Sequence, residues 1–339
     1  MRRFEIPAFG LDHLRLVERD SVDPGPREVV VRVRAISLNY RDLLTIQGTY
    51  NPKQPLPLVP MSDGAGEVVR VGADVSRVST GDRVVGSFFQ RWLSGPVPRD
   101  VRVLRSTLGG PYHGMLSEEV CLSEEGVECI PDHLSYEDAS TLPCAAVTAW
   151  SALISQGGLR PGETVLVQGT GGVAIFALQF AKMMGARVIV TSSSDEKLER
   201  VKALGADLGI NYRTEPDWGK RAKELTRGVG VDHVIELGGA ETLTQSLRAV
   251  RPGGQISLIG ILSGSAASLN ITPILMQNVR IQGVLVGPRS TLEEMNRALS
   301  LSGLRPVVDS VFEFTEVRAA LDHMVTGCHL GKIVVRVAD

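Results

Sequence analysis

The sequence predicts an α/β protein with two parts, a β-rich barrel and a doubly wound parallel sheet. Strand-like segments follow one another at short spacing in the first third of the chain. From about residue 146, strand-like and helix-like segments alternate, which is typical of a parallel sheet covered by helices on both faces. At 339 residues, the chain is also long for a single hydrophobic core, which favours two domains.

The first third supplies the strands of the predicted barrel. Residues 28–35 form an apolar run that alternates in its second half, and residues 64–72 form a second run bounded by glycines. Residues 81–86 form a turn followed by a short strand. Strands this short and this close together favour a small barrel. Residues 92–113 are irregular and rich in proline, glycine and arginine, so we expect a surface loop there.

The middle of the chain contains the strands of the predicted parallel sheet. Six are expected, at residues 164–168, 187–191, 208–211, 233–236, 255–259 and 280–286. Helices should lie between them, for example at residues 195–204 and 242–250. The tail changes type again, with helices expected at residues 291–301 and 315–326 and a closing strand at 332–337.

The turn after the strand at 164–168 is the most informative stretch of the sequence. Gly169, Gly171 and Ala174 fit the pattern G-x-G-x-x-[G/A], the fingerprint of a dinucleotide-binding turn. The first glycine allows the turn, the second lets backbone N–H groups approach a pyrophosphate, and the alanine lets the next helix pack closely. That helix then directs the partial positive charge of its N-terminus at the phosphates.

Composition excludes several functional classes. The formal net charge is −2 and no block of basic residues stands out, so no nucleic-acid partner is expected. No apolar stretch reaches about 18 residues, so no membrane span is expected, and the N-terminal residues lack the apolar core of a signal peptide. Cys121, Cys129, Cys144 and Cys328 are scattered rather than paired, which favours a reducing, cytoplasmic setting.

The order of barrel, nucleotide-binding part and short return segment resembles the medium-chain dehydrogenase/reductase superfamily. The stretches that carry this resemblance are residues 39–42, 63–68, 81–84, 169–174 and 331–334. The resemblance implies a GroES-like barrel domain at residues 1–145 and 287–339. It implies a Rossmann dinucleotide-binding domain at residues 146–286.

Zinc-dependent members of this superfamily hold their catalytic metal with three side chains. The matching positions here are Asn39, Ser62 and Cys144. An amide, a hydroxyl and one thiol do not make a zinc site, which needs thiolates, imidazoles or carboxylates. The closely spaced cysteines of a structural zinc lobe are also missing. We therefore expect no zinc, and the resemblance narrows to the quinone oxidoreductase-like, zinc-type alcohol dehydrogenase-like branch.

The resemblance implies a small-molecule substrate and hydride transfer to a quinone or an activated double bond. Simple alcohol oxidation is harder to explain, because no Lewis acid lowers the pKa of the alcohol. Two alternatives stay open: an alcohol dehydrogenase acting on small alcohols or ketones, and a dinucleotide-binding protein with little turnover. In many relatives the strand that matches residues 280–286 pairs with its copy in another subunit. A homodimer is therefore expected, since an apolar edge strand needs a partner.

Four residues are the catalytic candidates: Asn39, Tyr40, Asp42 and Tyr50. Asn39 could donate a hydrogen bond to a substrate carbonyl or to the nicotinamide ribose, or simply cap the next helix. Tyr40 and Tyr50 are candidate hydroxyl donors. Tyr50 matches a tyrosine that lines the substrate cleft of quinone reductase relatives, and its alternative is a half-buried aromatic with a solvated tip. Asp42 is expected to orient its neighbours, since an unpaired carboxylate would disfavour an enolate.

The choice of cofactor depends on the end of the second strand of the parallel sheet. NAD enzymes place an acidic residue there, but this chain has Ser192 and Ser193, which do not repel a 2′-phosphate. Lys197 and Tyr212 match residues that bind this phosphate in quinone reductase relatives, while Asp195 is expected to cap the helix. NADP(H) is therefore favoured over NAD(H). The other cofactor candidates are Thr148, Gly169, Thr170, Gly171, Gly172, Val173, Gly238, Gly260, Ile261 and Lys332.

Four residues also have simpler interpretations or only a structural one. Thr148 matches a threonine near the nicotinamide ring, or is an ordinary helix residue. Lys332 resembles a late lysine that reaches back to the cofactor, or is a solvated side chain. Asp63 stands where zinc enzymes carry Glu, and a structural hydrogen-bonding role is expected for it. Cys144 is expected to be a small apolar filler.

Overall fold

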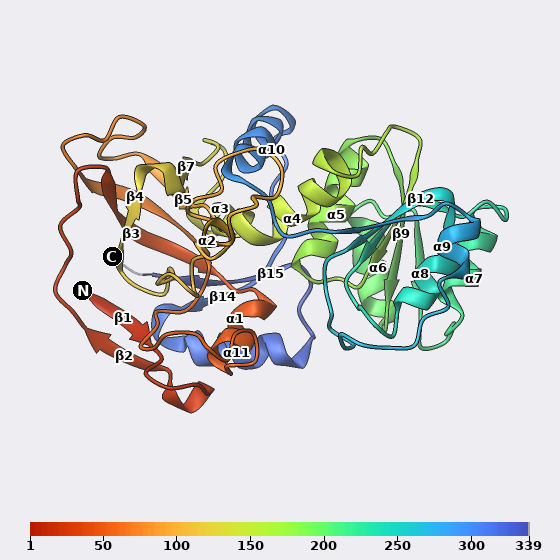
Figure 1. Cartoon of the computed structure of the whole chain (residues 1–339), viewed down its shortest axis with the longest axis horizontal. Coiled ribbons are helices and arrows are strands. Elements are labelled where there is room, and N and C mark those ends of the chain that lie inside the picture. The colour runs from red at the N-terminus through yellow and green to blue at the C-terminus, as the bar shows by residue number, and fades with distance from the viewer. Residues whose placement is uncertain (338–339) are drawn as a thin grey trace. The chain divides into compact units, whose positions relative to one another are not determined.

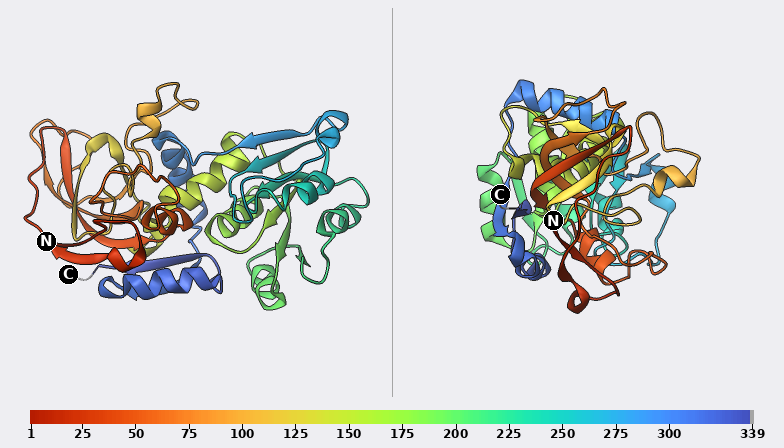
Figure 2. Two further views of the ribbon diagram at one scale, coloured as in Figure 1. Left: turned by 60° about the horizontal axis from the view of Figure 1, so that its bottom comes forward. Right: turned by 90° about the vertical axis from the view of Figure 1, so that its left-hand side faces the viewer.

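The computed structural model of the chain describes residues 1–337. These residues form two compact units, coloured by residue number in Figure 1. Unit 1 contains residues 1–147 and the segment that begins at residue 287, and unit 2 contains residues 148–286. Unit 1 is therefore built from both ends of the chain, and Figure 2 shows red and dark blue segments together in it.

Unit 1 is organised around the long strand β3. Its main sheet has the order β14-β15-β3-β4-β5-β7, and β6 also pairs with β3. All of these pairings are antiparallel except that of β14 with β15. Two register shifts bend β3 along β4, which lets it pair with β6 near its start and with β15 near its end. The strands are β3 (Glu28–Ser37), β4 (Asp63–Val71), β5 (Arg83–Gly86), β6 (Glu119–Ser123), β7 (Val127–Cys129), β14 (Val308–Glu313) and β15 (Lys332–Arg336).

The remaining elements of unit 1 are short or lie beside this sheet. A small hairpin pairs β1 (Arg2–Glu5) with β2 (Arg15–Glu18). The α-helices are α1 (Tyr40–Ile46), α2 (Val101–Leu104), α3 (Tyr136–Ser140), α10 (Arg289–Ser302) and α11 (Val317–Thr326). Single 3₁₀ turns are η1 (Leu11–His13), η2 (Glu124–Gly126) and η5 (Phe314–Glu316).

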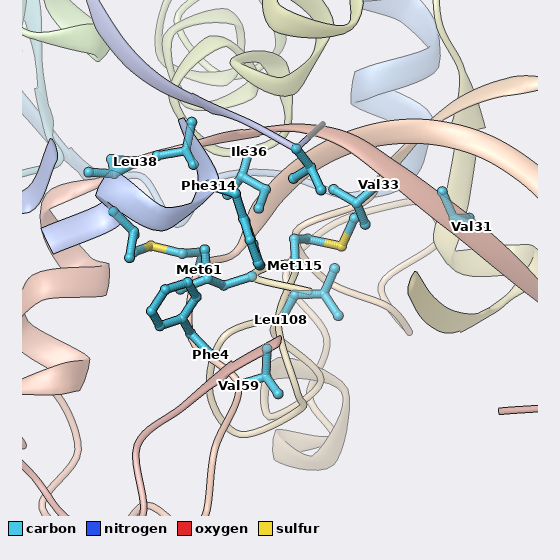
Figure 3. Close-up of a cluster of buried hydrophobic side chains, with 14 of the residues drawn as sticks. Phe4, Val31, Val33, Ile36, Leu38, Val59, Met61, Leu108, Met115 and Phe314 are labelled. Atoms are coloured by element: carbon cyan, nitrogen blue, oxygen red, sulfur yellow. The ribbon is translucent and has the colours of Figure 1, made fainter. Parts of the chain in front are cut away.

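The core of unit 1 brings distant segments of the chain together. Figure 3 shows Ile36 of β3, Met61, Met115 and Leu108 packed with Phe314, and each of these side chains is at least 96% buried. Leu108 belongs to residues 92–113, which were expected to form a surface loop. That prediction was wrong in part, because α2 forms within the segment and Leu108 fills a place in the core.

Unit 2 is a six-stranded parallel sheet with the order β10-β9-β8-β11-β12-β13. The strand order reverses between β8 and β11. Parallel sheets of this type bind ligands at the carboxyl ends of their strands, at this point of reversal. The strands are β8 (Thr164–Gln168), β9 (Arg187–Ser192), β10 (Leu208–Asn211), β11 (Val231–Glu236), β12 (Val250–Leu258) and β13 (Arg280–Gly283).

Helices connect the strands of unit 2 and cover its sheet. The connections through α5 and α6 run along the sheet in one direction, and the connection through α8 runs in the other. Because such connections are right-handed, α5 and α6 lie on one face of the sheet and α8 lies on the other (Figure 1). The helices are α5 (Gly172–Met183), α6 (Asp195–Ala203), α7 (Trp218–Leu225), α8 (Leu243–Ala249) and α9 (Thr272–Met276).

Most predicted elements of unit 2 are confirmed, with shifts at their ends. Strands β8 and β10 have their predicted bounds, whereas β13 ends at Gly283 and not at residue 286. Asp195 was wrongly expected to cap α6. The cap is Ser194, whose hydroxyl accepts a hydrogen bond from the N–H of Lys197. No helix among residues 1–337 is long and apolar enough to cross a membrane.

Candidate active site and cofactor site

The glycine-rich turn of unit 2 has the shape that a pyrophosphate requires. Gly169 follows β8 with a φ of +71°, and Gly171 caps α5 without a side chain that could accept a hydrogen bond. A Cβ added at either glycine would meet no atom within 4 Å, so the turn borders open space. No side chain caps the first turn of α5, which begins with Gly172 and Val173, so its backbone N–H groups can bind an anion. Residues 169–173 therefore fit the phosphates of a dinucleotide.

The end of β9 presents hydroxyl groups and no carboxylate. Ser192 is buried, and its Oγ accepts a hydrogen bond from the N–H of Ser194, so its own hydrogen is left to donate. The N–H of Tyr212 donates to the carbonyl of Ser192, which places the half-exposed tyrosine beside it. Lys197 lies in the first turn of α6. Asp195, the nearest carboxylate along the chain, accepts a hydrogen bond from Asn211.

Two turns meet at the carboxyl ends of β11 and β12. Gly260 donates its N–H to the carbonyl of Glu236, and an added Cβ on it would lie 2.2 Å from the carbonyl oxygen of Leu237. Only glycine allows the two turns to approach this closely. Gly238 donates its N–H to the side chains of Glu236 and Gln168. Ile261, in contrast, is 59% exposed.

The remaining cofactor candidates of unit 2 lie at its edges. Thr148 is buried in α4 (Val147–Trp150), between the π-helical segments η3 (Leu142–Ala146) and η4 (Ser151–Ser155). Ser193 follows β9 and is partly exposed. Gln168 and Glu236 were not among the predicted site residues, although each is a polar residue that ends an otherwise apolar strand.

A network of polar side chains occupies the interior of unit 1, and we call it the Asp63 network. Its members are Asn39, Ser62, Asp63, Cys144 and Lys332. The Lys332 ammonium donates to the side-chain oxygen of Asn39 at 2.6 Å, and the Asn39 amide donates to the Ser62 hydroxyl at 3.3 Å. Ser62 in turn donates to Asp63 at 2.7 Å, and the backbone N–H of Cys144 donates to the other oxygen of Asp63 at 3.0 Å. The three positions that match zinc ligands are thus joined through one carboxylate.

Burial shifts the charges of this network. Lys332 is only 3% exposed, so its interpretation as a solvated side chain was wrong. Burial lowers the pKa of Lys332 and the nearby Asp63 carboxylate opposes the shift. Burial likewise raises the pKa of Asp63 against the influence of Lys332. Burial and the charge of Asp63 also hold the pKa of the Cys144 thiol far above its usual value, so this thiol does not become a thiolate.

Asp42 connects the start of α1 to this network through hydrogen bonds from two backbone N–H groups. One of its oxygens accepts the N–H of Asn39 at 2.8 Å, and the other accepts the N–H of Ser62 at 3.2 Å. The side chain is fully buried, which raises its pKa to about 6, while the adjacent Arg41 guanidinium opposes the rise. Asp42 therefore lies where it orients two members of the network.

Arg41 links this region to Tyr50 and was missed from the sequence. Its guanidinium donates to the carbonyls of Leu108 and Gly110, both at 3.1 Å. The guanidinium carbon lies 4.9 Å from the ring centroid of Tyr50 and 5.0 Å from that of Phe88. Tyr50 is half exposed, so its ring is held by a buried cation while part of the side chain faces solvent.

Not every catalytic candidate of unit 1 joins this arrangement. Asn39 and Asp42 are part of it and Tyr50 contacts it through Arg41. Tyr40 is the first residue of α1 and is 48% exposed, and no bond joins its side chain to the network within residues 1–337. The amide oxygen of Asn39 accepts from the ammonium of Lys332, and its amide nitrogen donates to Ser62 and Asp63, so donation to a substrate requires one of the two bonds made by the nitrogen to exchange.

The donor set at the matched positions does not fit zinc. Across the described part of the chain, no group of three or more His, Cys, Asp or Glu side chains is arranged to hold a metal ion. The Asn39 oxygen accepts from an ammonium, the Ser62 hydroxyl donates to Asp63, and the Cys144 thiol stays protonated. A metal ion here would have to displace the positive charge of Lys332.

Comparisons with known proteins define the class of this protein. An alcohol dehydrogenase GroES-like domain model matches residues 25–132, and a zinc-binding dehydrogenase model matches residues 172–301. Together with the two folds, these matches define an oxidoreductase. The chain belongs to the medium-chain dehydrogenase/reductase superfamily, which confirms the predicted family and fold class. Binding of a nicotinamide cofactor is expected throughout this family.

Individual relatives fall into both branches of the family. A zinc-type alcohol dehydrogenase-like protein of Schizosaccharomyces pombe is 43% identical over 97% of this chain and 96% of its own. A quinone oxidoreductase of Pseudomonas aeruginosa is 35% identical over 80% of this chain and 76% of its own.

Similar solved structures include alcohol dehydrogenases. A crystal structure from Sinorhizobium meliloti has a TM-score of 0.93 and 45% identity, covering 99% of this chain and 98% of its own. An NAD-dependent alcohol dehydrogenase has a TM-score of 0.91 and 34% identity over the whole of both chains. A cobalt- and zinc-bound alcohol dehydrogenase of Pyrobaculum aerophilum has a TM-score of 0.84 and 27% identity over 99% of both chains.

Proposed function

We propose that this protein is a zinc-independent, NADPH-dependent oxidoreductase that transfers hydride to a quinone or to an activated double bond. The observation that carries the proposal is the Asp63 network. The residues that match zinc ligands are bonded to one another and to a buried ammonium, and they have no thiolate or imidazole to offer a metal. A substrate that already carries an electrophilic carbon needs no metal to accept hydride.

The residues of unit 2 hold the cofactor in this proposal. Bound NADPH supplies the hydride. Gly169 shapes the turn, residues 170–173 bind the pyrophosphate with backbone N–H groups, and the hydroxyl of Ser192 together with Lys197 and Tyr212 binds the 2′-phosphate. Ser193, Thr148, Gly238, Gly260 and Ile261 complete the proposed contacts.

The residues of unit 1 stabilise charge on the substrate. Negative charge develops on the carbonyl oxygen of a quinone or enone as hydride arrives. Tyr50, held by Arg41, offers its hydroxyl to that oxygen. Lys332 donates to the amide oxygen of Asn39 and so polarises the amide, and its ammonium places a positive charge inside unit 1. Asp42 accepts the N–H of Asn39 and so fixes the start of α1, where Asn39 and Tyr40 lie.

The preference for NADPH is tested by Ser192→Asp. A carboxylate at the end of β9 repels the 2′-phosphate and accepts hydrogen bonds from the ribose hydroxyls, so the preference should shift toward NADH by about tenfold or more. The ratio of kcat/KM for the two cofactors measures this shift. An unchanged ratio contradicts the placement of the phosphate at Ser192.

Two other functions remain in competition. The similarity to an NAD-dependent alcohol dehydrogenase favours oxidation of small alcohols or reduction of ketones. A cofactor-binding protein with little turnover is the second alternative. A panel of quinones, enones, enoyl thioesters, ketones and alcohols, each with NADPH and NADH, separates the three. Turnover of quinones or enones but not of simple ketones or alcohols supports the proposal, and turnover of alcohols alone contradicts it.

We also propose that the protein is a cytoplasmic homodimer that pairs through unit 2. Strand β13 lies at the end of the parallel sheet and is mostly exposed. Leu275 and Met276 of the neighbouring helix α9 are 80% and 74% exposed, which is unusual for apolar side chains of this size. Light scattering should give twice the mass of the 36.5 kDa chain, and a monomer would contradict the pairing.

A further inference from the structure

Glu236 is a buried carboxylate at the carboxyl end of β11, and its side chain is surrounded by uncharged donors. The residue has no exposed surface. One oxygen accepts hydrogen bonds from the N–H groups of Gly238 and Gly239 and from the Thr242 hydroxyl, at 2.9, 2.9 and 2.6 Å. The other accepts from the side-chain amide of Gln168 at 2.7 Å and from the Ser246 hydroxyl.

The donors around Glu236 suit a carboxylate that accepts hydrogen bonds at both oxygens. The side-chain oxygen of Gln168 accepts the N–H groups of Leu237 and Gly238, both at 3.0 Å, so its NH₂ group must face Glu236. Both oxygens of Glu236 are thus occupied by donors, and a carboxylate accepts at both oxygens without having to donate. No ion pair includes Glu236 within residues 1–337, so its charge has no positive partner there.

The position of this charge is set by the topology of the sheet. Gln168 ends β8 and Glu236 ends β11, and these two strands are neighbours at the point where the strand order reverses. The first half of such a sheet carries the glycine-rich turn and binds one nucleotide, and the second half, which begins with β11, binds the other. The turn at residues 237–239 opens that second half.

The turn directs its polar backbone inward. The N–H groups of Leu237, Gly238 and Gly239 all donate to Gln168 or Glu236. The carbonyl of Gly238 accepts from both the N–H and the hydroxyl of Ser263. The turn therefore offers little of its own hydrogen bonding to a ligand. The negative charge behind it acts over distance instead, in surroundings of low dielectric constant.

We propose that Glu236 makes this site bind the oxidised form of the nicotinamide cofactor more tightly, relative to the reduced form, than a neutral residue would. The inference rests on the proposed cofactor site of unit 2. The oxidised nicotinamide ring carries a positive charge that the reduced ring lacks. A buried anion behind the turn of the nicotinamide half therefore stabilises the oxidised form selectively, since only that form gains a Coulomb attraction.

The test compares the affinities of the two cofactor forms in variants of the full-length protein. Dissociation constants for NADP⁺ and NADPH are measured by calorimetry and by fluorescence of the reduced ring. Glu236→Gln removes the charge, so the ratio of the NADP⁺ to the NADPH constant should rise by about three- to tenfold. Glu224→Gln, at an exposed glutamate of α7, is the matched control and should leave the ratio unchanged.

A reciprocal exchange separates charge from hydrogen bonding. In the double variant Gln168→Glu with Glu236→Gln, the new glutamate accepts from Leu237, Gly238 and the exchanged amide. The new glutamine accepts from Gly238, Gly239 and Thr242. Every described bond between the two side chains and the turn is kept and the charge stays at the same junction. The ratio should therefore return most of the way to its original value.

A third variant tests the charge without removing Glu236. Gln168→Lys sets an ammonium against the carboxylate, and the ratio should rise as in Glu236→Gln, so the test does not depend on the folding of one variant. Equal weakening of both cofactor forms, with the ratio unchanged in Glu236→Gln and Gln168→Lys, overturns the inference and leaves Glu236 a purely structural residue. If the original protein binds neither form, the proposed function itself fails and this inference fails with it.

Discussion

Both units bury carboxylates next to a proposed functional site, but they stabilise the charge in different ways. In unit 1, Asp63 and Asp42 lie near the buried cations Lys332 and Arg41. In unit 2, Glu236 has five uncharged donors and, among residues 1–337, no cation. A buried carboxylate that relies on one opposite charge loses most of its stabilisation when that charge is removed. A carboxylate that accepts several hydrogen bonds from neutral donors loses only a part when one donor is removed. The two units should therefore respond very differently to single substitutions.

Removing Lys332 should have the largest effect. Lys332→Met keeps much of the volume of the side chain but removes the ammonium that bonds Asn39 and the Leu38 carbonyl and whose charge opposes the effect of burial on Asp63, so unit 1 should lose about 3–5 kcal/mol of stability. Urea unfolding measures the loss, with Lys220→Met on the exposed face of α7 as the control. The double variant with Asp63→Asn should recover most of it, because no unpaired charge remains. Equal losses in the single and double variants would show that the interaction between the charges of Lys332 and Asp63 does not contribute to the stability of unit 1.

Asp42 should make unit 1 less stable as the pH rises from about 4 to 6. Its pKa is raised to about 6 in the folded state, against 3.8 for an aspartate side chain in water. Between these values the folded state holds a proton that the unfolded state has released, so the slope of stability against pH is negative and the total change is about 3 kcal/mol.

The matched variant Asp42→Asn isolates this contribution from other titrating groups. Unfolding free energies of both proteins are measured at pH 4 and pH 7. The stability of the original protein relative to Asp42→Asn should fall across this range. A difference that is the same at both pH values, or that grows with pH, contradicts the raised pKa.

Removing one donor from Glu236 should have a smaller effect. Thr242→Val deletes one of five hydrogen bonds with little change in shape, and the expected loss is about 1–2 kcal/mol. Urea unfolding followed by a probe in unit 2 measures it. A loss as large as that of Lys332→Met would show that the ring of neutral donors does not share the stabilisation.

The contrast between the two units also explains how far the sequence could be interpreted. The glycine-rich turn between β8 and α5 and the strands β8 and β10 depend on local patterns of apolar and glycine residues, and their positions were predicted correctly. The burial of Lys332 was not, because its partner Asn39 lies 293 residues away along the chain. The role of Arg41 depends likewise on carbonyls at Leu108 and Gly110.

Glu236 and Gln168 could have been noticed from the sequence but not understood. Each ends an apolar strand with a polar residue, which indicates a buried and fully bonded side chain. Only the sheet order, which makes β8 and β11 neighbours, shows that the two side chains meet. Ser192 differs in that its place at the end of β9 and its chemistry are both local, so its proposed role in cofactor choice could be stated before the fold was known.

The metal content of the active protein tests the central proposal most directly. The chain is produced in medium containing zinc, purified without chelator, and analysed by mass spectrometry for metals while NADPH oxidation by a quinone is followed. We expect well below one equivalent of zinc per chain and turnover that dialysis against a strong chelator does not reduce. Stoichiometric zinc, with activity that falls on its removal and returns when it is restored, would contradict the proposal that the protein works without zinc and that the Asp63 network occupies the place of a zinc site.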